Sequence, residues 1–449
     1  MKLDFLHNKW FKFALYGGLY LLWVIWLGNY WWLIGLAVIF DIYVTKKVHW
    51  AFWKKRSKNG EKVKNNVFVE WFDALLFAVV AATFIRMFFI EAYTIPTSSM
   101  EKSLLVGDYL FVSKIKYGPK VPETPLSFPL VHNVMPIFGG ESYSQLIKND
   151  YRRLKGYSKI KRDDIVVFGF PHGDTVLKGA PMEDYYTLVR FNGKDFTEKK
   201  WGPIIVRPND KKDNYVKRCV AIAGDTLSVV NGKVFVNGVP QPNLEGIQNS
   251  YTVSTNGTAI NPKILMDMGM NQDEIFYDSS LPGYPFLPLT EKELKEIKNL
   301  GNVVDVKQNI EQYSEGSSNH ILLFPYSKDF KWTQDNYGPI WIPQQGSTIE
   351  LNMSNYVLYS RIITAYEKNS MEVKNNEIYI NGEKVNSYTF KQNYYFMMGD
   401  NRHNSLDSRY WGFVPEDHIV GTPSVVWFSS DKNKTFPRNI RWSRIFKFV

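Results

Sequence analysis

Long apolar segments near the N-terminus constrain this chain more than any other feature. The sequence FALYGGLYLLWVIWL covers residues 13–27, YWWLIGLAVIFDIYV covers 30–44, and WFDALLFAVVAATFIRMFFI covers 71–90. About 20 apolar residues cross a bilayer as a helix, so the third segment is of spanning length. The first two segments are shorter, and they fit either one long helix or a hairpin that turns at Gly28 and Asn29.

Basic residues flank these segments and predict their orientation. Lys9 and Lys12 precede the first pair of segments, Lys46 and Lys47 follow it, and residues 46–66 are strongly basic. Cytoplasmic membrane flanks collect Lys and Arg, so we expect a hairpin with both ends in the cytoplasm. A cleaved signal peptide is not expected, because a basic loop and another span follow. The net charge of +10 is explained by such flanks better than by a nucleic-acid partner.

The rest of the chain has the pattern of a β protein. Short β-branched and aromatic runs are separated by turn residues, and Asn237-Gly238 is a strong hairpin signal. Residues 369–384 repeat the layout of 225–240 at an offset of 144 residues, which places Arg361 where the first copy has Lys217. Either a true duplication or the common rules of hairpin turns explains this repeat.

A helix is predicted after a capping box formed by Thr290 and Glu293, with Gly301 as its stop. We therefore interpret residues 244–345 as an α/β subdomain inserted in a mainly β extracytoplasmic domain. The predicted division is a transmembrane hairpin of two short spans over 1–45, a basic cytoplasmic loop over 46–68, a transmembrane helix over 69–91, a first β part over 92–243, the insertion over 244–345 and a second β part over 346–449.

Several chemistries are disfavoured by the sequence. The seven histidines are scattered without an H-x-x-x-H pair, and the single cysteine, Cys219, excludes an internal disulfide. No Gly-rich phosphate loop precedes a predicted helix. We therefore expect no metal and no cofactor.

One short motif, Ser99-Met-Glu-Lys102, matches the S-x-x-K nucleophile pattern of penicillin-binding enzymes. Those enzymes also need an S-x-N element and a K-[ST]-G strand. Ser317-Ser318-Asn319 supplies the first by a pattern that arises easily by chance, and the second is absent. We therefore regard Lys102 as a bystander and look for the partner of the serine elsewhere.

Four segments, taken in order, carry a family resemblance. They are IPTSSMEKSLLVGDYLFV from 95, DDIVVFGFP from 163, YVKRCVAIAGD from 215 and GDNRHNSLDSRYWGFVPE from 399. Together with VVWFSSDK and IRWSRIF near the C-terminus, they resemble the successive boxes of bacterial type I signal peptidases. The resemblance covers the third apolar segment, the boxes and the tail, but neither the first hairpin nor residues 244–345 in any specific way.

The resemblance implies a fold, an activity and a set of site residues. It implies a membrane serine endopeptidase of the bacterial cytoplasmic membrane that removes signal peptides from exported preproteins, with the lipid bilayer as its surroundings and its catalytic domain on the outer face. It makes Ser99 the nucleophile and Lys217 the general base. The other residues that it implies are Thr97 in the oxyanion hole, Ser405 orienting the lysine, Asp400, Arg402, Asp407 and Arg409 as supports, and Ile95, Met100, Leu104, Tyr215 and Val216 around the substrate.

The sequence departs from the family pattern in three places. Glu101-Lys102 replaces the usual residue-proline pair, AIAGD lacks the usual proline before Gly224, and His403 replaces an acidic residue. None of these changes removes a catalytic group, but each alters a loop.

Chemistry explains why a lysine can serve as the base. A serine hydroxyl is a weak nucleophile until a base takes its proton, and lysine can do so only when it is neutral. Free lysine has a pKa of ~10.4, and burial lowers the pKa of an ammonium group. Lys217 lies in an otherwise apolar strand pattern, where we expect that burial.

Two other classes of protein fit the sequence less well. A membrane-anchored β protein that only binds exported peptides would not need the set formed by Ser99, Lys217 and Ser405. A self-cleaving repressor with Ser/Lys chemistry would need a DNA-binding helix pair, which is not predicted here.

Overall fold

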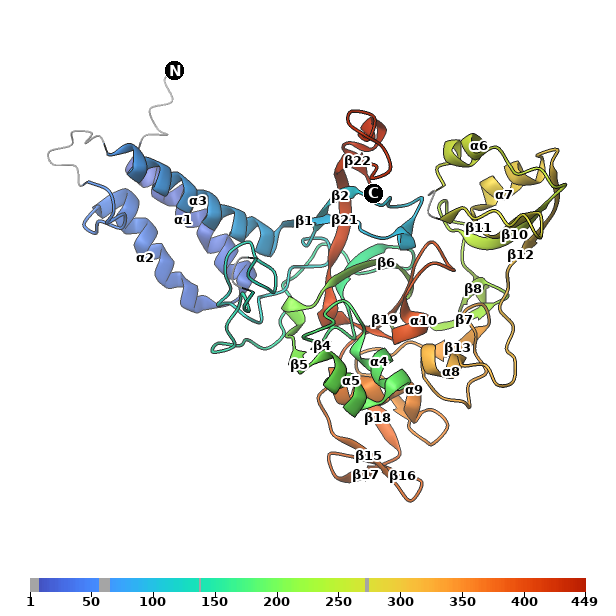
Figure 1. Ribbon diagram of the computed structural model, residues 1–449. Coiled ribbons are helices and arrows are strands. Elements are labelled where there is room, and N and C mark those ends of the chain that lie inside the picture. Colours follow the sequence, from blue (N-terminus) through green and yellow to red (C-terminus); the bar gives the residue numbers. More distant parts are fainter. Residues whose placement is uncertain (1–7, 56–64, 137–138, 271–273) are drawn as a thin grey trace.

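Three helical segments lie side by side at one end of the molecule (Figure 1). The structure is a computed structural model that describes residues 8–55, 65–136, 139–270 and 274–449. By length and composition, α1 (Lys9–Leu27) and α3 (Val67–Phe88) can cross a membrane. A shorter apolar segment, Tyr30–Thr45, lies between them in the sequence and has α2 (Ile34–Phe40) at its centre. Much of the predicted basic loop, residues 56–64, lies outside the described residues.

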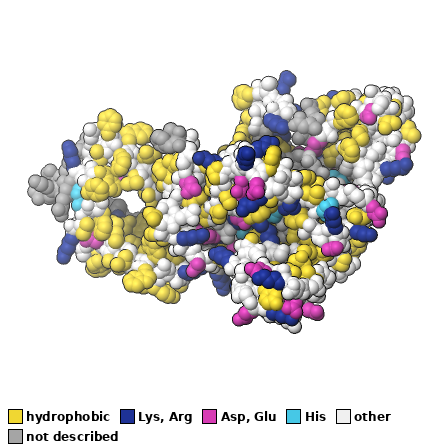
Figure 2. Space-filling view, turned by 60° about the horizontal axis from the view of Figure 1, so that its bottom comes forward, with side chains coloured by type: hydrophobic (Ala, Val, Ile, Leu, Met, Phe, Trp, Pro, Cys, Tyr) yellow, Lys and Arg dark blue, Asp and Glu magenta, His cyan; other side chains and the backbone are white. Residues whose placement is uncertain are grey.

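The first two helical segments form a hairpin at the predicted turn. Gly28 ends α1 in the left-handed region with a φ of 63°, which glycine adopts without strain. The arms then return antiparallel, since Phe13 packs edge-on against Phe40 and Tyr16 stacks on Tyr43. Apolar side chains cover the surface of this helical end, whereas charged groups are mixed over the rest of the molecule (Figure 2).

A curled antiparallel sheet forms the centre of the molecule. Its strand order is β1-β2-β21-β3-β6-β19-β20, with β22 also paired to β21. The strands are β1 (Ile90–Thr94), β2 (Asp108–Ser113), β3 (Ile165–Gly169), β6 (Asn214–Ala221), β19 (Tyr394–Met398), β20 (Val414–Pro415), β21 (Ile419–Ser429) and β22 (Lys447–Phe448). The Tyr93 hydroxyl accepts a hydrogen bond from Asn214 at 3.1 Å. That bond joins edge strand β1 to β6 across the sheet, which therefore curls.

The sheet is attached directly to the helices. α3 ends at Phe88, and β1 begins at Ile90, so the helix starts two residues earlier and ends three residues earlier than the predicted 69–91. Leu27, Phe88 and Leu154 form a small buried cluster at this junction. Within the junction, the Trp26 indole N–H donates to the Lys155 carbonyl at 3.1 Å.

Two hairpin units contribute apolar residues to the main core and reproduce the sequence repeat. The first comprises β7 (Thr226–Val230), β8 (Lys233–Val236) and β9 (Val239–Pro240), and the second comprises β15 (Met371–Lys374), β16 (Glu377–Ile380) and β17 (Glu383–Val385). Asn237 accepts from the Thr226 N–H at 2.8 Å, and Asn381 accepts from the Ser370 N–H at 2.9 Å. The correspondence ends upstream, because Lys217 lies in strand β6 whereas the matching Arg361 ends helix α9 (Tyr356–Arg361).

A compact α/β unit lies at the end of the molecule away from the helices (Figure 1). We call residues 249–308 the distal unit. It holds the sheet β11-β10-β12 with helices α6 and α7 around a core of its own. Its elements are β10 (Asn249–Thr255), α6 (Pro262–Asp267), β11 (Gly283–Leu289), α7 (Glu291–Lys298) and β12 (Val303–Gln308).

The capping box predicted at Thr290 and Glu293 is confirmed, with both reciprocal hydrogen bonds present. The end of the predicted subdomain is different. Within 244–345, β13 (Tyr337–Trp341) leaves the distal unit and pairs with β7, so this strand belongs to the four-stranded sheet β13-β7-β8-β9. The side chain of Ile340 is buried in the main core with Leu227. This burial explains why β13 joins β7 and not the distal unit.

The remaining elements surround the main core. They are β4 (Thr175–Leu177), α4 (Tyr185–Asn192), α5 (Lys194–Trp201), β5 (Ile204–Val206), α8 (Asn319–Leu322), β14 (Thr348–Glu350), β18 (Ser387–Thr389) and α10 (Ser408–Trp411). The largest apolar cluster includes Val220, Leu227, Ile340, Phe396 and Phe413.

Candidate active site

A short turn after β1 presents Ser99. The chain leaves β1 at Thr94 and forms a 3₁₀ turn at Ser98–Met100. Ile95 and Met100 anchor this turn, since both are buried in an apolar cluster with Leu104. Ser99 itself is 8% exposed.

Lys217 reaches the Ser99 hydroxyl from strand β6. Its Nζ lies 2.7 Å from Ser99 Oγ and 3.1 Å from the Val216 carbonyl oxygen. The lysine is only 4% exposed. The two residues proposed from the sequence as nucleophile and base, 118 positions apart, are therefore in hydrogen-bond contact.

Burial lowers the pKa of Lys217 to about 8, against a weaker opposing effect of the carboxylates of Asp407 and Asp400. The nearest aromatic ring, that of Tyr215, lies 5.7 Å from Nζ. Both carboxylates have arginine partners of their own, Arg409 and Arg218. Because their charge is neutralised locally, they do not hold the lysine fully protonated.

Four of the five residues predicted to line a substrate pocket lie together. Ile95, Met100 and Leu104 form one apolar cluster, and Val216 packs against it. Tyr215 belongs instead to the opposite face of β6, where its ring stacks on Phe170 at a centroid distance of 4.6 Å. Side chains alternate along a strand, so Tyr215 lies on the same face of β6 as Lys217, and its ring is 5.7 Å from Lys217 Nζ.

Thr97 and Ser405 both lie close to Ser99. The role expected of Thr97, a hydrogen bond to the oxyanion, concerns the bound substrate. Thr97 is exposed, and its side chain makes no capping bond to the turn. The predicted bond from Ser405 to Lys217 is not formed. The Ser405 hydroxyl is buried and has no hydrogen-bond partner among the residues that the structure describes.

The loop 399–409 is fixed by ion pairs. Asp407 and Arg409 pair at 2.8 Å and are almost fully buried. Burial raises the pKa of Asp407, but Arg409 more than offsets it, so the net pKa is lowered. Asp400, expected only as a support of this loop, pairs with Arg218 at 2.6 Å. The buried Arg402 donates to Gln241 at 2.8 Å.

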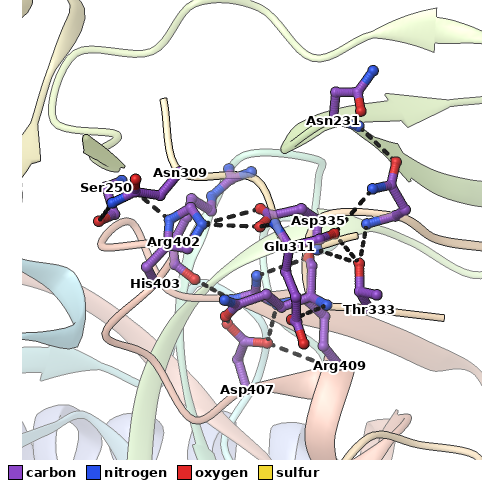
Figure 3. Close-up of polar contacts among 12 residues, drawn as sticks. Asn231, Ser250, Asn309, Glu311, Thr333, Asp335, Arg402, His403, Asp407 and Arg409 are labelled. Atoms are coloured by element: carbon purple, nitrogen blue, oxygen red, sulfur yellow. Dashed lines mark hydrogen bonds and ion pairs between the residues drawn. The ribbon is translucent and has the colours of Figure 1, made fainter. Parts of the chain in front are cut away.

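His403 connects this loop to the distal unit (Figure 3). Its Nδ1 accepts from the Ser250 N–H at 3.1 Å, so the other nitrogen carries the proton and donates to Asp335 at 3.1 Å. Arg409 also donates to the Arg402 carbonyl in the same region, at 2.5 Å. The replacement of an acidic residue by His403 therefore fits a local hydrogen-bond network.

Three contributors to the site were not identified from the sequence. Arg218 and Ser103 both bind Asp400, and so tie β6 and the turn of Ser99 to the loop. Gly399 lies between Ser405 and the backbone of Ser99. A Cβ at this position would lie 2.2 Å from Ser405 Oγ and 2.6 Å from the Ser99 carbonyl oxygen. In the sequence, Arg218 follows Lys217 and Gly399 precedes Asp400, so both lie next to residues that had been predicted. Their partners depend on tertiary contacts, which the sequence does not reveal.

A buried serine hydroxyl in hydrogen-bond contact with a buried amine is the arrangement that a serine hydrolase with a lysine base needs. The sequence profile of the family described as signal peptidase, peptidase S26, matches residues 68–284 and 386–428. The chain belongs to this family and is a serine peptidase of the bacterial type I signal peptidase class. The match extends further into the distal unit than the sequence boxes indicated.

Relatives of the chain are similar over most of their length. Signal peptidase I of Buchnera aphidicola from Acyrthosiphon pisum is 27% identical over 86% of this chain and 83% of its own. The enzyme of Haemophilus influenzae is 24% identical over 84% and 75%, and that of Helicobacter pylori strain J99 is 24% identical over 83% and 89%.

Gly399→Ala is expected to lower kcat by roughly a hundredfold, because an added methyl group must displace Ser405 or the Ser99 carbonyl, and displacements of about 1 Å have effects of this size. Cleavage of a preprotein by the purified full-length chain measures it. Gly301→Ala is the matched control, since nothing lies within 4 Å of its Cβ. Wild-type activity in Gly399→Ala would contradict the packing described here.

Proposed function

We propose that this chain is a membrane-bound endopeptidase that removes N-terminal signal peptides from exported preproteins, with Ser99 as nucleophile and Lys217 as general base. The observation that carries the proposal is the 2.7 Å contact between Lys217 Nζ and Ser99 Oγ, both on buried residues. Family membership supplies the reaction, and this contact supplies the residues.

The reaction begins when neutral Lys217 takes the proton of the Ser99 hydroxyl as the oxygen attacks the scissile carbonyl. The protonated lysine then gives this proton to the amine of the leaving mature chain. Water then attacks the ester carbonyl on Ser99 while Lys217 takes a proton from it. The bond to the Ser99 oxygen breaks, the signal peptide leaves with a new carboxyl group, and Lys217 returns its proton to the Ser99 oxygen. A pKa of about 8 leaves a useful fraction of the amine neutral near neutral pH.

The oxyanion that forms during attack needs donors. The Ser99 N–H and the Thr97 hydroxyl are the two groups that we assign to it. Thr97 is exposed and makes no capping bond, so its hydroxyl is free to turn toward the substrate. Donors of this kind act by stabilising charge that appears only in the transition state.

Ser405 is assigned to orient the amine of Lys217. Its hydroxyl is buried without a partner in the described part of the chain, and a buried hydroxyl of this kind is costly unless it is used. Gly399 keeps Ser405 next to the segment that carries Ser99. Asp407 and Arg409, with Asp400 and Arg402, support the loop around it.

An extended substrate segment fits between two free strand edges. β1 is the last strand on its side of the sheet. β6 pairs with β19 only from Arg218 onward, so its segment 214–217 has one open edge within the described structure. The two edges run parallel and are joined by Tyr93 and Asn214 at one end. A peptide that adds a strand here places its scissile bond at Ser99, beside the apolar cluster of Ile95, Met100 and Leu104.

The position of the site agrees with a substrate that arrives in the bilayer. Only β1 separates α3 from the turn of Ser99, so the nucleophile lies close to the end of an apolar helix. At this end, Glu91 binds both Arg86 at 2.7 Å and Lys114 at 2.9 Å. These charged groups suit the outer interface. We therefore assign 1–45 and 69–91 to a multi-pass anchor, with the β domain on the outer face of the cytoplasmic membrane.

Ser99→Ala and Lys217→Ala are each expected to abolish cleavage of a secretory preprotein, because one lacks the nucleophile and the other lacks the base. Processing by the purified full-length chain in detergent, followed by gel electrophoresis, measures the loss. Ser98→Ala is the matched control and should keep substantial activity, since its hydroxyl only accepts from Asn404. Full activity in Lys217→Ala would contradict the assignment of Lys217 as the general base.

Thr97→Ala is expected to slow turnover by roughly ten- to a thousandfold if its hydroxyl stabilises the oxyanion. Thr97→Ser should recover most of the rate because it keeps the hydroxyl. The ratio of the two kcat values on the same preprotein is the measurement. Equal rates for Thr97→Ala and the wild type would show that the Thr97 hydroxyl does not stabilise the oxyanion.

A further inference from the structure

Lys102 occupies an unusual backbone position directly after the turn of Ser99. Its φ is 70°, in the left-handed region that residues other than glycine adopt uncommonly. Proline, the usual residue at this place in the family pattern, has φ fixed near −65° and does not fit this conformation. The turn that carries the nucleophile therefore needs a different restraint in this chain.

The side chain of Lys102 supplies contacts of that kind. Its Nζ donates to the carbonyl oxygens of Met268 and Gly269 at 2.7 and 2.9 Å. It also pairs with Glu293 at 2.7 Å, and the two side chains are 14% and 7% exposed. An ammonium group has three protons to donate, and each has an acceptor here. All three acceptors belong to the distal unit.

Glu293 is itself firmly held. One carboxylate oxygen accepts from the Thr290 N–H at 2.8 Å and from its hydroxyl at 2.9 Å in the capping box of α7. The other oxygen faces Lys102. Helix α7 is anchored in the core of the distal unit by the fully buried Ile297. The ion pair thus joins the Ser99 turn to a packed body rather than to a loose surface.

The distal unit also contacts the other side of the site. Ser250 of β10 donates to His403, and the preceding Gln248 exchanges backbone hydrogen bonds with the Asp400 carbonyl and the Arg402 N–H at 2.8 and 3.0 Å. The distal unit and the residue that precedes it therefore contact both the turn that carries Ser99 and the loop 399–409.

We propose that Lys102 is a positioning residue for the peptidase reaction, through which the distal unit keeps Ser99 in contact with Lys217. The proposal rests on the function assigned above to Ser99 and Lys217. Lys102 touches neither reacting atom and takes no part in proton transfer. It fixes the turn, and a displacement of about 1 Å in a reacting group lowers rates by about a hundredfold. The lysine of the S-x-x-K motif therefore positions the turn and does not act as an acid or a base.

The test uses the full-length chain in detergent with Lys102→Gly, which removes the side chain but keeps the left-handed backbone accessible. We expect kcat to fall ten- to a hundredfold while KM changes less than about twofold, because the substrate edges of β1 and β6 are untouched. Lys102→Arg should recover at least a third of kcat by donating to the same acceptors. Glu293→Gln should lower kcat as well, and the losses in the double variant should be less than additive.

Two controls separate positioning from a general loss of structure. Val253→Ala opens a cavity in the fully buried centre of the distal unit and should lower the melting temperature without lowering kcat. Lys292→Ala removes an exposed lysine from the same helix as Glu293 and should change neither.

Three outcomes would overturn the proposal: a wild-type kcat in Lys102→Gly, a change confined to KM, or an equal fall of kcat in Val253→Ala. Each of these readings is compared with Ser99→Ala and Lys217→Ala on the same preprotein. Loss of cleavage in those two variants with no effect of Lys102→Gly would reject the positioning role alone. Cleavage by Ser99→Ala would instead reject the proposed function.

Discussion

The site depends on one physical constraint, the burial of the Lys217 amine against the Ser99 hydroxyl. A lysine in water is protonated near neutral pH and cannot accept a proton. Here the side chain is 4% exposed, and burial lowers its pKa to about 8. The nearest carboxylates, Asp407 and Asp400, are paired with arginines. The surrounding structure thus serves to bury an amine without placing a free negative charge beside it.

Three segments that are distant in the sequence create this environment. The turn after β1 brings the hydroxyl, strand β6 brings the amine, and the loop 399–409 closes the space beside them. The Asn401 N–H donates to the Ser99 carbonyl at 3.1 Å, and Arg218 joins β6 to Asp400. Because the sheet curls, β1 and the open segment of β6 approach each other, and we propose that the substrate adds as a strand between them. Helix α3 ends just before β1.

Much of this arrangement could be predicted from local sequence. The hairpin turn at Gly28, the capping box at Thr290 and the Asn-Gly hairpins depend on residues within a few positions of one another. The pairing of Ser99 with Lys217 was predicted from the order of family boxes, and the structure adds their distance. The partners of Asp400 and Lys102 were not predictable in this way. Each is chosen by packing between segments more than a hundred residues apart, and an alternative partner was present nearby in the sequence.

The repeat of hairpin units shows the same limit. Asn237 and Asn381 make equivalent bonds because the turn chemistry is local. Upstream, the corresponding segments form a strand at Lys217 and a helix end at Arg361. The strand pairs with β3 and β19 in the curled sheet, whereas Arg361 binds Asp174 and the Pro171 carbonyl. Tertiary surroundings decide which of the two copies carries the amine.

The most direct measurement is the titration of the Lys217 amine itself. Lysine labelled with ¹³C at Cε in the full-length chain gives an NMR signal for each amine, and the Lys217→Arg variant identifies the one that belongs to Lys217. The account predicts a midpoint at a pH of about 8, well below the ~10.4 of free lysine. A midpoint near that of free lysine would contradict it, because the amine would then be charged where the enzyme works and could not accept the Ser99 proton.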